Sequence, residues 1–380
     1  MTVGMRIAII TNSRIPSLTA NSIQAMKVCQ ALAQLGHDIR LFAPRETAPD
    51  TWEHLASHYG LSTPFEIEWL PSAPVLKRYD FTLHSILKAR KFKADTVYTW
   101  LLNPAVVALW LGCPVILEMH AEVTGRIGPW LMRRFWRSSM RKRMLVTTRP
   151  LRDAIETVAG LEFSDDAVQI APNGVDPAQY ESLPGAAEAR RQLGLEEKLT
   201  VGFTGHIYPG RGADLLFELA GRMPDVNFLW VGGKPDDVNY WREKLADAGA
   251  SNVTMTGFVE NSRLPLYQSA AEVLLMPYGR SISASSGQDI AEVINPMKMF
   301  DYMAAGRAIL SADLPVIHEV LNERNAVFCE PGNVDAWESR LRELLSDEPR
   351  RLALGTQAQM DVAGYTWVTR AERALEGFGR

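Results

Sequence analysis

The chain has 380 residues, of which 47% are hydrophobic and 22% are charged. Its length predicts two compact domains of roughly 150–200 residues each, and its composition excludes disordered, collagen-like and coiled-coil proteins. The net charge of −4 argues against a general nucleic-acid-binding protein, because such proteins usually carry an excess of Lys and Arg.

The sequence favours a cytoplasmic protein. Its three cysteines, Cys29, Cys113 and Cys329, have no CxxC spacing and support neither a disulfide framework nor a zinc site, so a reducing compartment fits them best. The N-terminal residues do not show the basic, apolar and cleavage regions of a signal peptide. The longest apolar stretch, residues 104–119, is shorter than the ~20 residues that span a bilayer.

Short apolar runs alternate with amphipathic stretches in the first half of the chain, which is typical of βαβ units and parallel sheets. The expected strands are residues 6–11, 38–44, 96–100, 114–120, 144–148 and 168–172. The expected helices lie near residues 21–35, 83–91, 105–111, 130–141 and 151–159.

A second series of the same kind follows a Pro-, Gly- and Ala-rich passage at residues 172–189, which we expect to link two domains. Its expected strands are residues 200–205, 227–232, 253–258, 273–277, 308–311 and 326–330, and its last helices lie near residues 335–345, 350–362 and 367–378. The predicted fold class is therefore α/β, with two doubly wound domains. Ligands of such domains lie beyond the carboxyl ends of the strands, and a cleft between two domains is the natural site.

The sequence lacks the motifs of several common classes of enzyme. The loop after the first strand, residues 12–17, contains no glycine, so the GxGxxG fingerprint of a dehydrogenase is absent there. The GxxxxGK[ST], GxSxG and HExxH patterns are absent as well. No Asp-x-Asp occurs, and we therefore expect no metal at a nucleotide-sugar site.

The glycine-rich segment at residues 205–212 is the first candidate site. Backbone N–H groups, the dipole of the helix expected from Ala213 and the permanent charge of Arg211 together favour an anion such as phosphate. A tight turn with a solvated arginine is the alternative interpretation.

The helix expected at residues 296–306 is the second candidate site. Pro296 fits its first position, and Gly306 fits its end. Lys298 in the first turn is electrostatically unfavourable unless an anion binds there, and Asp301 on the same face suits a ribose diol. An amphipathic helix with a chance salt bridge is the alternative.

Two further strand ends carry candidate residues. Phe258 and Val259 offer backbone amides that can read the edge of a nucleobase, although a plain strand end fits them equally well. His120 closes the strand at residues 114–120 and suits hydrogen bonding to sugar hydroxyls or phosphate. A purely structural histidine is the alternative.

These segments together resemble the retaining glycosyltransferases of family 4, which have the GT-B fold of two facing Rossmann-like domains. The resemblance extends over nearly the whole chain and rests on residues 31–39, 171–176, 205–212, 266–277, 297–306, 311–315 and 365–367. It implies an N-terminal, acceptor-side domain of residues 1–182 plus 364–380, to which the last helix crosses back. Residues 183–363 would form the C-terminal domain that binds the nucleotide sugar.

The sequence departs from the family pattern at three places. The family's phosphate turn carries arginine where His206 stands and lysine where Arg211 stands. The family's two glutamates map onto Val293 and Asp301, so the first is lost. The candidates to replace it are Glu292, Asp289 and the turn at residues 285–287. The usual glycine-rich turn after the first strand is replaced by residues 17–22, where Asn21 is expected to cap the first helix and to touch the diphosphate.

The resemblance implies a metal-independent, retaining transfer of a hexose from a nucleotide diphosphate sugar, with UDP-glucose as the best guess, to a hydroxyl of a glycan or lipid-linked glycan. Arg211 and Lys298 would stabilise the leaving diphosphate, and His120 would orient the sugar; these three are the expected catalytic residues. The expected donor-binding residues are Asn21, Gly205, His206, Arg211, Phe258, Val259, Glu292, Met297, Lys298 and Asp301. A GT-B epimerase or phosphorylase, or a degenerate protein that only binds nucleotide sugar, is the alternative.

The first half of the chain also carries a strongly basic stretch. Between Lys77 and Arg152 there are 15 Lys or Arg and four Asp or Glu. Arg133, Arg137 and Arg141 follow a four-residue spacing, which predicts one basic face on the helix at residues 130–141. We expect this face to dock on anionic lipid headgroups at the inner side of a membrane, and a solvated basic face is the alternative.

Overall fold

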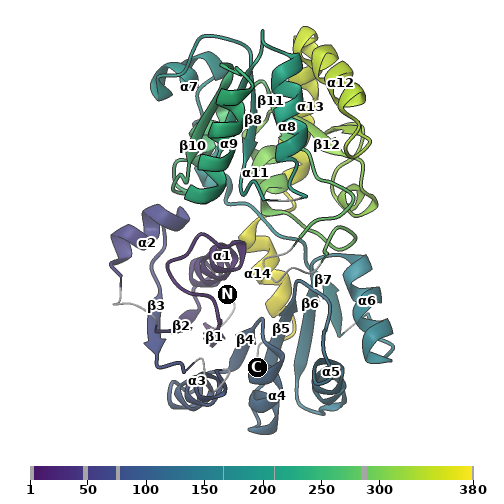
Figure 1. Cartoon of the computed structure of the whole chain (residues 1–380). Helices are drawn as coiled ribbons and strands as arrows, with labels where there is room; N and C mark the ends of the chain where they lie inside the picture. The colour runs from purple at the N-terminus through teal and green to yellow at the C-terminus, as the bar shows by residue number, and fades with distance from the viewer. Residues whose placement is uncertain are drawn as a thin grey trace. The chain divides into compact units, whose positions relative to one another are not determined.

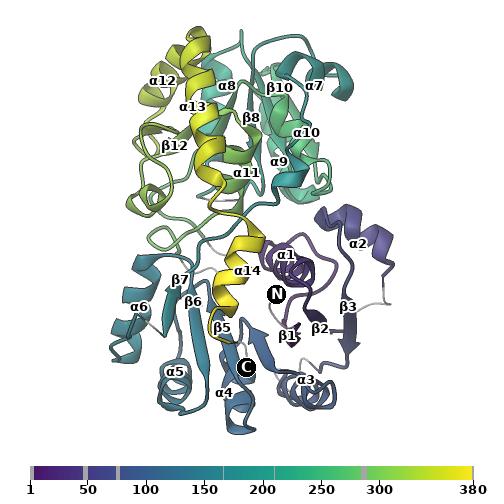
Figure 2. The same ribbon diagram turned by 180° about the vertical axis from the view of Figure 1, so that it is seen from behind.

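The computed structural model describes residues 4–45, 50–73, 78–165, 167–208, 210–283 and 289–378. The chain divides into two compact units (Figures 1 and 2): unit 1 comprises Met1–Asn173 and Trp367–Arg380, and unit 2 comprises Gly174–Thr366. These boundaries differ from those expected at 182/183 and 363/364. The segment after Asn173 belongs to unit 2 because the N–H of Val175 donates to the Tyr365 carbonyl at 2.9 Å and Val175 forms a β-bridge with Thr366.

The described part of unit 1 contains a parallel sheet of seven strands in the order β3-β2-β1-β4-β5-β6-β7. The strands are β1 (Arg6–Ile10), β2 (Asp38–Pro44), β3 (Glu66–Leu70), β4 (Thr96–Thr99), β5 (Val115–Met119), β6 (Lys142–Val146) and β7 (Val168–Ile170). The helices are α1 (Ala20–Gln34), α2 (Trp52–Tyr59), α3 (Tyr79–Lys91), α4 (Leu102–Trp110), α5 (Gly128–Arg137), α6 (Arg149–Ala159) and α14 (Trp367–Leu375).

The described part of unit 2 contains a parallel sheet of six strands in the order β10-β9-β8-β11-β12-β13. The strands are β8 (Thr200–Thr204), β9 (Asn227–Val231), β10 (Val253–Gly257), β11 (Val273–Met276), β12 (Ala308–Ala312) and β13 (Val327–Cys329). The helices are α7 (Ala186–Leu193), α8 (Ala213–Arg222), α9 (Pro235–Asp247), α10 (Leu264–Ser269), α11 (Met297–Ala305), α12 (Val334–Ser346) and α13 (Glu348–Val362).

The prediction of two doubly wound α/β domains is confirmed. The central strands β5 and β8 are buried along their whole length, as strands covered by helices on both faces of a parallel sheet must be. Each sheet reverses its strand order once, between β1 and β4 in unit 1 and between β8 and β11 in unit 2. Loops diverge at such a reversal and leave room for a ligand at the carboxyl ends of the strands.

The last helix of the chain belongs to unit 1, although the residues before it belong to unit 2. Helix α14 packs against α1, and Figure 2 shows it in yellow beside that helix. The expected return of the C-terminal helix to the N-terminal domain is therefore confirmed.

Sequence analysis missed α2 and β3 in unit 1 and α7, α9 and α10 in unit 2, where α7 begins inside the passage expected to be a linker. Strand β3 lies at the edge of the sheet and pairs only with β2, so its charged and apolar residues alternate instead of forming a continuous apolar run. The helix expected at residues 130–141 is α5, which ends at Arg137. It ends there because Ser138 has an extended backbone and the chain enters β6 at Lys142.

Candidate functional site

Two glycines in unit 2 shape the turn that follows β8. A Cβ atom on Gly205 would lie 3.0 Å from Nζ of Lys298, and a Cβ atom on Gly212 would lie 2.0 Å from the carbonyl oxygen of Pro277. Both glycines have positive φ angles, +124° for Gly205 and +92° for Gly212. Residues that carry a side chain rarely adopt such angles. The absence of side chains at these positions lets the turn pack against both the start of α11 and the end of β11.

Arg211 and Lys298 lie over aromatic rings at this place. The guanidinium of Arg211 is 5.2 Å from the ring centre of Tyr208 and 5.8 Å from that of Tyr278. Nζ of Lys298 is 3.8 Å from the ring centre of Phe203 and 5.6 Å from that of Tyr278. These rings stabilise cations without cancelling their charge.

Among the described residues, no carboxylate forms a salt bridge with this pair of cations, and Nε of Arg211 is buried without a hydrogen-bond partner. Burial, and then repulsion from Arg211, lowers the pKa of the Lys298 ammonium well below its usual value, while Asp301 opposes this shift in part. An anion at this place would remove the cost of holding two cations together.

Helix α11 is fixed to the end of β8 by Tyr302, whose hydroxyl oxygen accepts a hydrogen bond from the Thr204 N–H at 2.8 Å. The half-buried Asp301 lies beside Tyr180, and burial together with that carboxylate raises the pKa of the Tyr180 hydroxyl. Gly306 ends α11 with φ of +65°, as predicted. Pro296, however, is the N-cap with an extended backbone and not the first helical residue.

The remaining donor candidates of unit 2 surround the same ends of the strands. His206 stacks on Tyr208 with ring centres 5.3 Å apart. At the end of β10, Phe258 is exposed and Val259 is half-buried, while Met297 is the half-buried first residue of α11.

Glu292 and Asp289, the two acidic candidates to replace the family's first glutamate, are both exposed. Val293 itself is buried. The carboxylate of Asp289 accepts hydrogen bonds from the N–H groups of Ile282 and Ala291 at 2.9 and 3.0 Å, so it organises its own loop. The expected turn at residues 285–287 lies outside the described residues.

In unit 1, His120 follows β5 and belongs to a buried polar cluster. Its Nε2 lies 2.5 Å from Oε1 of Glu118. Because a carboxylate can only accept, Nε2 carries the proton. The side-chain amide of Gln24 donates to the same Oε1 at 2.6 Å and to Oδ1 of Asn173 at 3.0 Å. The hydrogen bond to Glu118 thus fixes the orientation of the imidazole ring.

Arg370 on α14 completes this cluster. Its guanidinium donates to the carboxylate of Glu118, to the hydroxyl of Tyr98 at 3.3 Å and to the carbonyl of Pro172 at 2.9 Å. Burial alone would raise the pKa of the Glu118 carboxyl, but Arg370 and His120 together hold it well below its usual range. Glu118 is therefore an ionised carboxylate enclosed by donors.

Two expectations for unit 1 are wrong. Asn21 is exposed in the first turn of α1 and is not its cap: Thr19 holds the N-cap position, and Ser22 Oγ donates to its carbonyl at 2.9 Å. Arg133, Arg137 and Arg141 do not share a helical face, because α5 ends at Arg137. Arg133 donates to the Ala159 carbonyl at 3.0 Å, and Arg141 donates to that of Phe378 at 3.2 Å.

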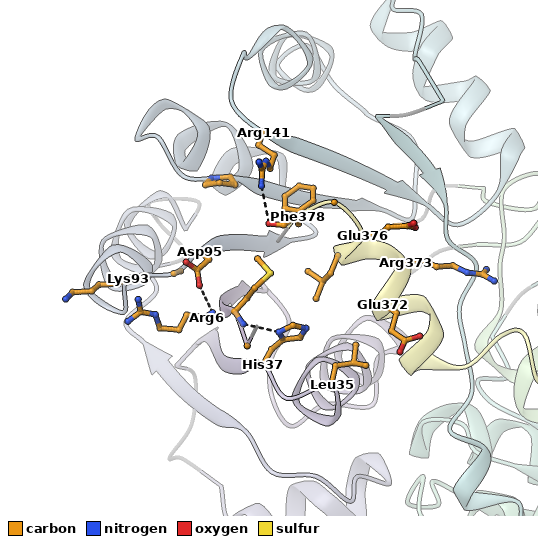
Figure 3. A pocket seen from close by; sticks show the side chains of 16 residues that line it. Arg6, Leu35, His37, Lys93, Asp95, Arg141, Glu372, Arg373, Glu376 and Phe378 are labelled. Carbon is orange, nitrogen blue, oxygen red and sulfur yellow. Dashed lines mark hydrogen bonds between the residues drawn. The ribbon is translucent and has the colours of Figure 1, made fainter. Parts of the chain in front are cut away.

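A cavity of about 1560 Å³ in unit 1 lies away from these candidates (Figure 3). Its lining residues include Arg6 at the start of β1 and Asp95 just before β4, so it opens at the amino ends of the strands. Ligands of doubly wound sheets bind at the opposite ends. Of the residues expected to form a site, only Arg141 is among the described residues that line this cavity.

Sequence analysis missed most of the residues that hold these sites. The signal for Glu118 was a charged residue inside an otherwise apolar strand, which requires a buried partner. No pattern pointed to Arg370, which lies 252 residues further along the chain. Phe203, Tyr208 and Tyr278 gave no signal either, because an aromatic residue near a strand end is usually part of a core.

The part of the chain that the structure describes lacks two features that are common in other types of site. No group of three or more His, Cys, Asp or Glu side chains there is arranged to hold a metal ion. None of the described helices combines the length and apolar character that crossing a bilayer requires.

Family models match both halves of the chain. Residues 198–347 match the model described as glycosyl transferases group 1, and residues 22–179 match the model described as glycosyltransferase family 4. Among curated proteins, the chain is 28% identical over 212 residues to the 2-deoxystreptamine glucosyltransferase of Streptomyces kanamyceticus, a match that covers 50% of this chain and 54% of the relative. It is 28% identical over 250 residues to a D-inositol 3-phosphate glycosyltransferase of Mycobacteroides abscessus, with 63% and 52% covered.

The chain thus spans about half the length of these curated relatives. The whole fold is similar to the crystal structure of HepE from Anabaena in complex with UDP-glucose, with a TM-score of 0.74 and 15% identity over 98% of this chain and 99% of that one. This similarity establishes the GT-B fold.

Proposed function

We propose that this chain, whose two halves carry glycosyltransferase domains on a GT-B fold, transfers a sugar from a nucleotide diphosphate sugar to a hydroxyl of an acceptor. The observation that carries the proposal is the pair of cations in unit 2, Arg211 and Lys298. They share the carboxyl end of β8, lie on aromatic rings, and have no carboxylate salt bridge among the described residues. A diphosphate supplies the missing negative charge.

We further propose UDP-glucose as the donor. HepE, with the same fold, has been crystallised with UDP-glucose, and a curated relative is named a glucosyltransferase. The exposed ring of Phe258 and the backbone amides beside it are assigned to the nucleobase, and Asp301 is assigned to the ribose hydroxyls, where a carboxylate accepts two hydrogen bonds.

The charge that develops when the sugar leaves lies on the diphosphate oxygens. Arg211, Lys298 and the first N–H groups of α11 would stabilise that charge, which requires no metal ion. The reaction is therefore proposed to be metal-independent, with these residues in the role that a divalent cation has elsewhere.

The transfer is proposed to retain the anomeric configuration by attack from the front face. A double displacement needs a mobile carboxylate, whereas Glu118 is enclosed by Arg370, Tyr98 and Gln24. The acceptor hydroxyl would give its proton to the leaving phosphate. His120 is assigned to orient the transferred sugar through Nδ1, and Glu118 and Gln24 act as positioning residues that fix its ring.

The acceptor is proposed to be a hydroxyl of a glycan or a lipid-linked glycan. The curated relatives are named after different acceptors, an aminocyclitol and an inositol phosphate, which share closely spaced hydroxyl groups on a ring. The family match therefore supports a polyhydroxylated acceptor as a class.

Incubation of the purified protein with a panel of nucleotide sugars in the presence of EDTA tests this proposal. We expect slow release of free sugar from UDP-glucose without an acceptor, and NMR of the first product should show the anomeric configuration of the donor. Conversion of the donor to its epimer would indicate an epimerase. Binding of UDP-glucose without turnover, with every acceptor class offered, would indicate a binding protein and contradict the proposal.

A further inference from the structure

Helix α3 exposes a stripe of large apolar side chains. Tyr79, Leu83 and Leu87 follow one another at four-residue intervals and are each 49–52% exposed. Residues at this spacing lie on one face of a helix. The opposite face of α3 is buried through residues such as Phe81 and Ile86, so the stripe points away from the core of unit 1.

The neighbouring helices also expose large apolar side chains. Helix α4 packs against α3 on one side and against α5 on the other, and both ribbon views show the three helices next to one another (Figures 1 and 2). Trp110 at the end of α4 is 63% exposed, and Ile127 and Trp130 at the start of α5 are 60% and 42% exposed. We call the exposed side chains of α3, α4 and α5 the apolar–basic face.

Among the described residues of unit 2, the exposed large apolar side chains have no comparable arrangement. Leu199, Tyr240 and Phe258 lie on separate segments, and Leu352 and Met360 lie eight residues apart on α13. Singly exposed apolar residues are normal on a protein surface, whereas a gathered set marks an interaction site.

Cations accompany the apolar residues of this face. Ile127, Trp130, Arg134 and Arg137 follow a spacing of three, four and three residues, which places them on one side of α5. The guanidinium of Arg134 lies 5.2 Å from the Trp130 ring centre. Further exposed cations are Arg90 and Lys91 at the end of α3 and Arg126 before α5.

No acidic side chain is exposed among the described residues between 78 and 151. Glu118 is buried, and Asp80, Asp95 and Glu122 are half-buried. The carboxylates of Asp80 and Asp95 accept hydrogen bonds from the N–H groups of Ala73 and Arg6 at 2.8 Å. The face therefore combines apolar and positively charged side chains without exposed negative charge.

We propose that the apolar–basic face docks on a lipid bilayer that contains anionic headgroups. Tryptophan prefers the boundary between headgroups and acyl chains, leucine and isoleucine insert their side chains there, and arginine binds lipid phosphates. A second copy of the chain is a poorer partner, because pairing this face with itself brings like charges together. The proposal does not depend on the proposed glycosyl transfer.

The residue set differs from the one expected from sequence. Arg133 and Arg141 donate to backbone carbonyls within unit 1, and only Arg137 of the original three remains. In the apolar–basic face, Arg126 and Arg134 take the place of Arg133 and Arg141, and the apolar stripe of α3 is an additional part. The proposal thus predicts that the α3 stripe contributes to lipid binding as much as the arginines do.

Flotation of the full-length chain with phosphatidylcholine vesicles, with and without 30% phosphatidylglycerol, tests the proposal. We expect binding to anionic vesicles to be at least tenfold tighter than to neutral ones and to weaken in high salt. The triple variant R126Q/R134Q/R137Q should lose the preference for anionic lipid. The variant L83Q/L87Q should bind anionic vesicles at least fivefold more weakly and release them at lower salt.

Two matched controls use unit 2 of the same chain. R324Q/R340Q/R350Q removes three exposed arginines, and L352Q/M360Q removes two exposed apolar residues; both should bind vesicles like the wild type. Absence of vesicle binding by cooperatively folded wild-type protein at low salt would overturn the proposal. Equal binding by wild type and both face variants would also overturn it. A dimer that forms in light scattering and is lost in L83Q/L87Q, without vesicle binding, would assign the face to a second copy instead.

Discussion

Each unit places charged side chains at the carboxyl ends of its central strands, but the two sets are balanced differently. In unit 1, Glu118 is enclosed by Arg370, Tyr98, Gln24 and His120, so its negative charge is met entirely by neighbouring side chains. In unit 2, Arg211 and Lys298 lie on aromatic rings without a carboxylate salt bridge in the described ranges.

The difference separates a site whose charge is balanced by the protein itself from a site whose charge calls for a ligand. In unit 1, four side chains donate to the Glu118 carboxylate, and the bond from His120 fixes its ring before any ligand arrives. The cluster of unit 2 concentrates positive charge, and burial together with repulsion from Arg211 lowers the pKa of Lys298. Removing a charge should therefore have opposite effects on stability in the two units.

The largest effect is expected from breaking the buried pair in unit 1. Glu118→Leu or Arg370→Met leaves a buried charge without its partner, which costs about 3–5 kcal/mol of unfolding free energy. The double variant Glu118→Leu with Arg370→Met removes both charges and should recover at least half of that loss. Chemical denaturation of the four proteins measures this; additive losses would contradict the pairing.

Removing the cations of unit 2 should impair the reaction and not the fold. Arg211→Met or Lys298→Met removes a charge-assisted contact to the diphosphate, which costs about 2–4 kcal/mol of transition-state stabilisation. The unfolding free energy without ligand should stay constant or rise in both variants. Arg340→Met on α12 is the matched control, with unchanged turnover. Unchanged turnover in the Arg211 and Lys298 variants as well would refute the assignment.

The stability of unit 2 should also depend on pH through Lys298. Its folded-state pKa lies below that of the unfolded chain, so the unfolded state binds the proton more tightly between these two values. The unfolding free energy of the ligand-free protein should therefore rise with pH in that window, by at most about 1.4 kcal/mol per pH unit. Denaturation at several pH values measures the slope, and Lys298→Met should lack this contribution.

A smaller effect is expected at Asp301. Asp301→Asn keeps the shape of the side chain but replaces one acceptor oxygen by an N–H donor, which should cost about 1 kcal/mol of binding to the ribose hydroxyls. The KM for the donor should rise about fivefold while kcat changes little. Steady-state kinetics checks this. A fall in kcat with KM unchanged would place Asp301 at the reacting centre instead.

The fold and the residues of unit 2 were the most predictable parts of this molecule. Strand-end glycines, a helix with lysine in its first turn and Gly306 at its end, and alternating apolar runs are local patterns, and each indicated its element correctly. The cluster around His120 was not predictable, because its members come from α1, β4, β5 and α14 and meet only in the folded chain. The basic face was misplaced because a four-residue spacing does not reveal that α5 ends at Arg137.

The central claim is that a diphosphate supplies the negative charge that balances Arg211 and Lys298. Calorimetry of UDP binding in EDTA, in buffers of different ionisation enthalpy between pH 7.5 and 9.5, measures the protons taken up on binding. Because the diphosphate raises the pKa of Lys298, the wild type should take up protons on binding and Lys298→Met should not. Tight binding of UDP without proton uptake across this range, or equal uptake in both proteins, would contradict the account.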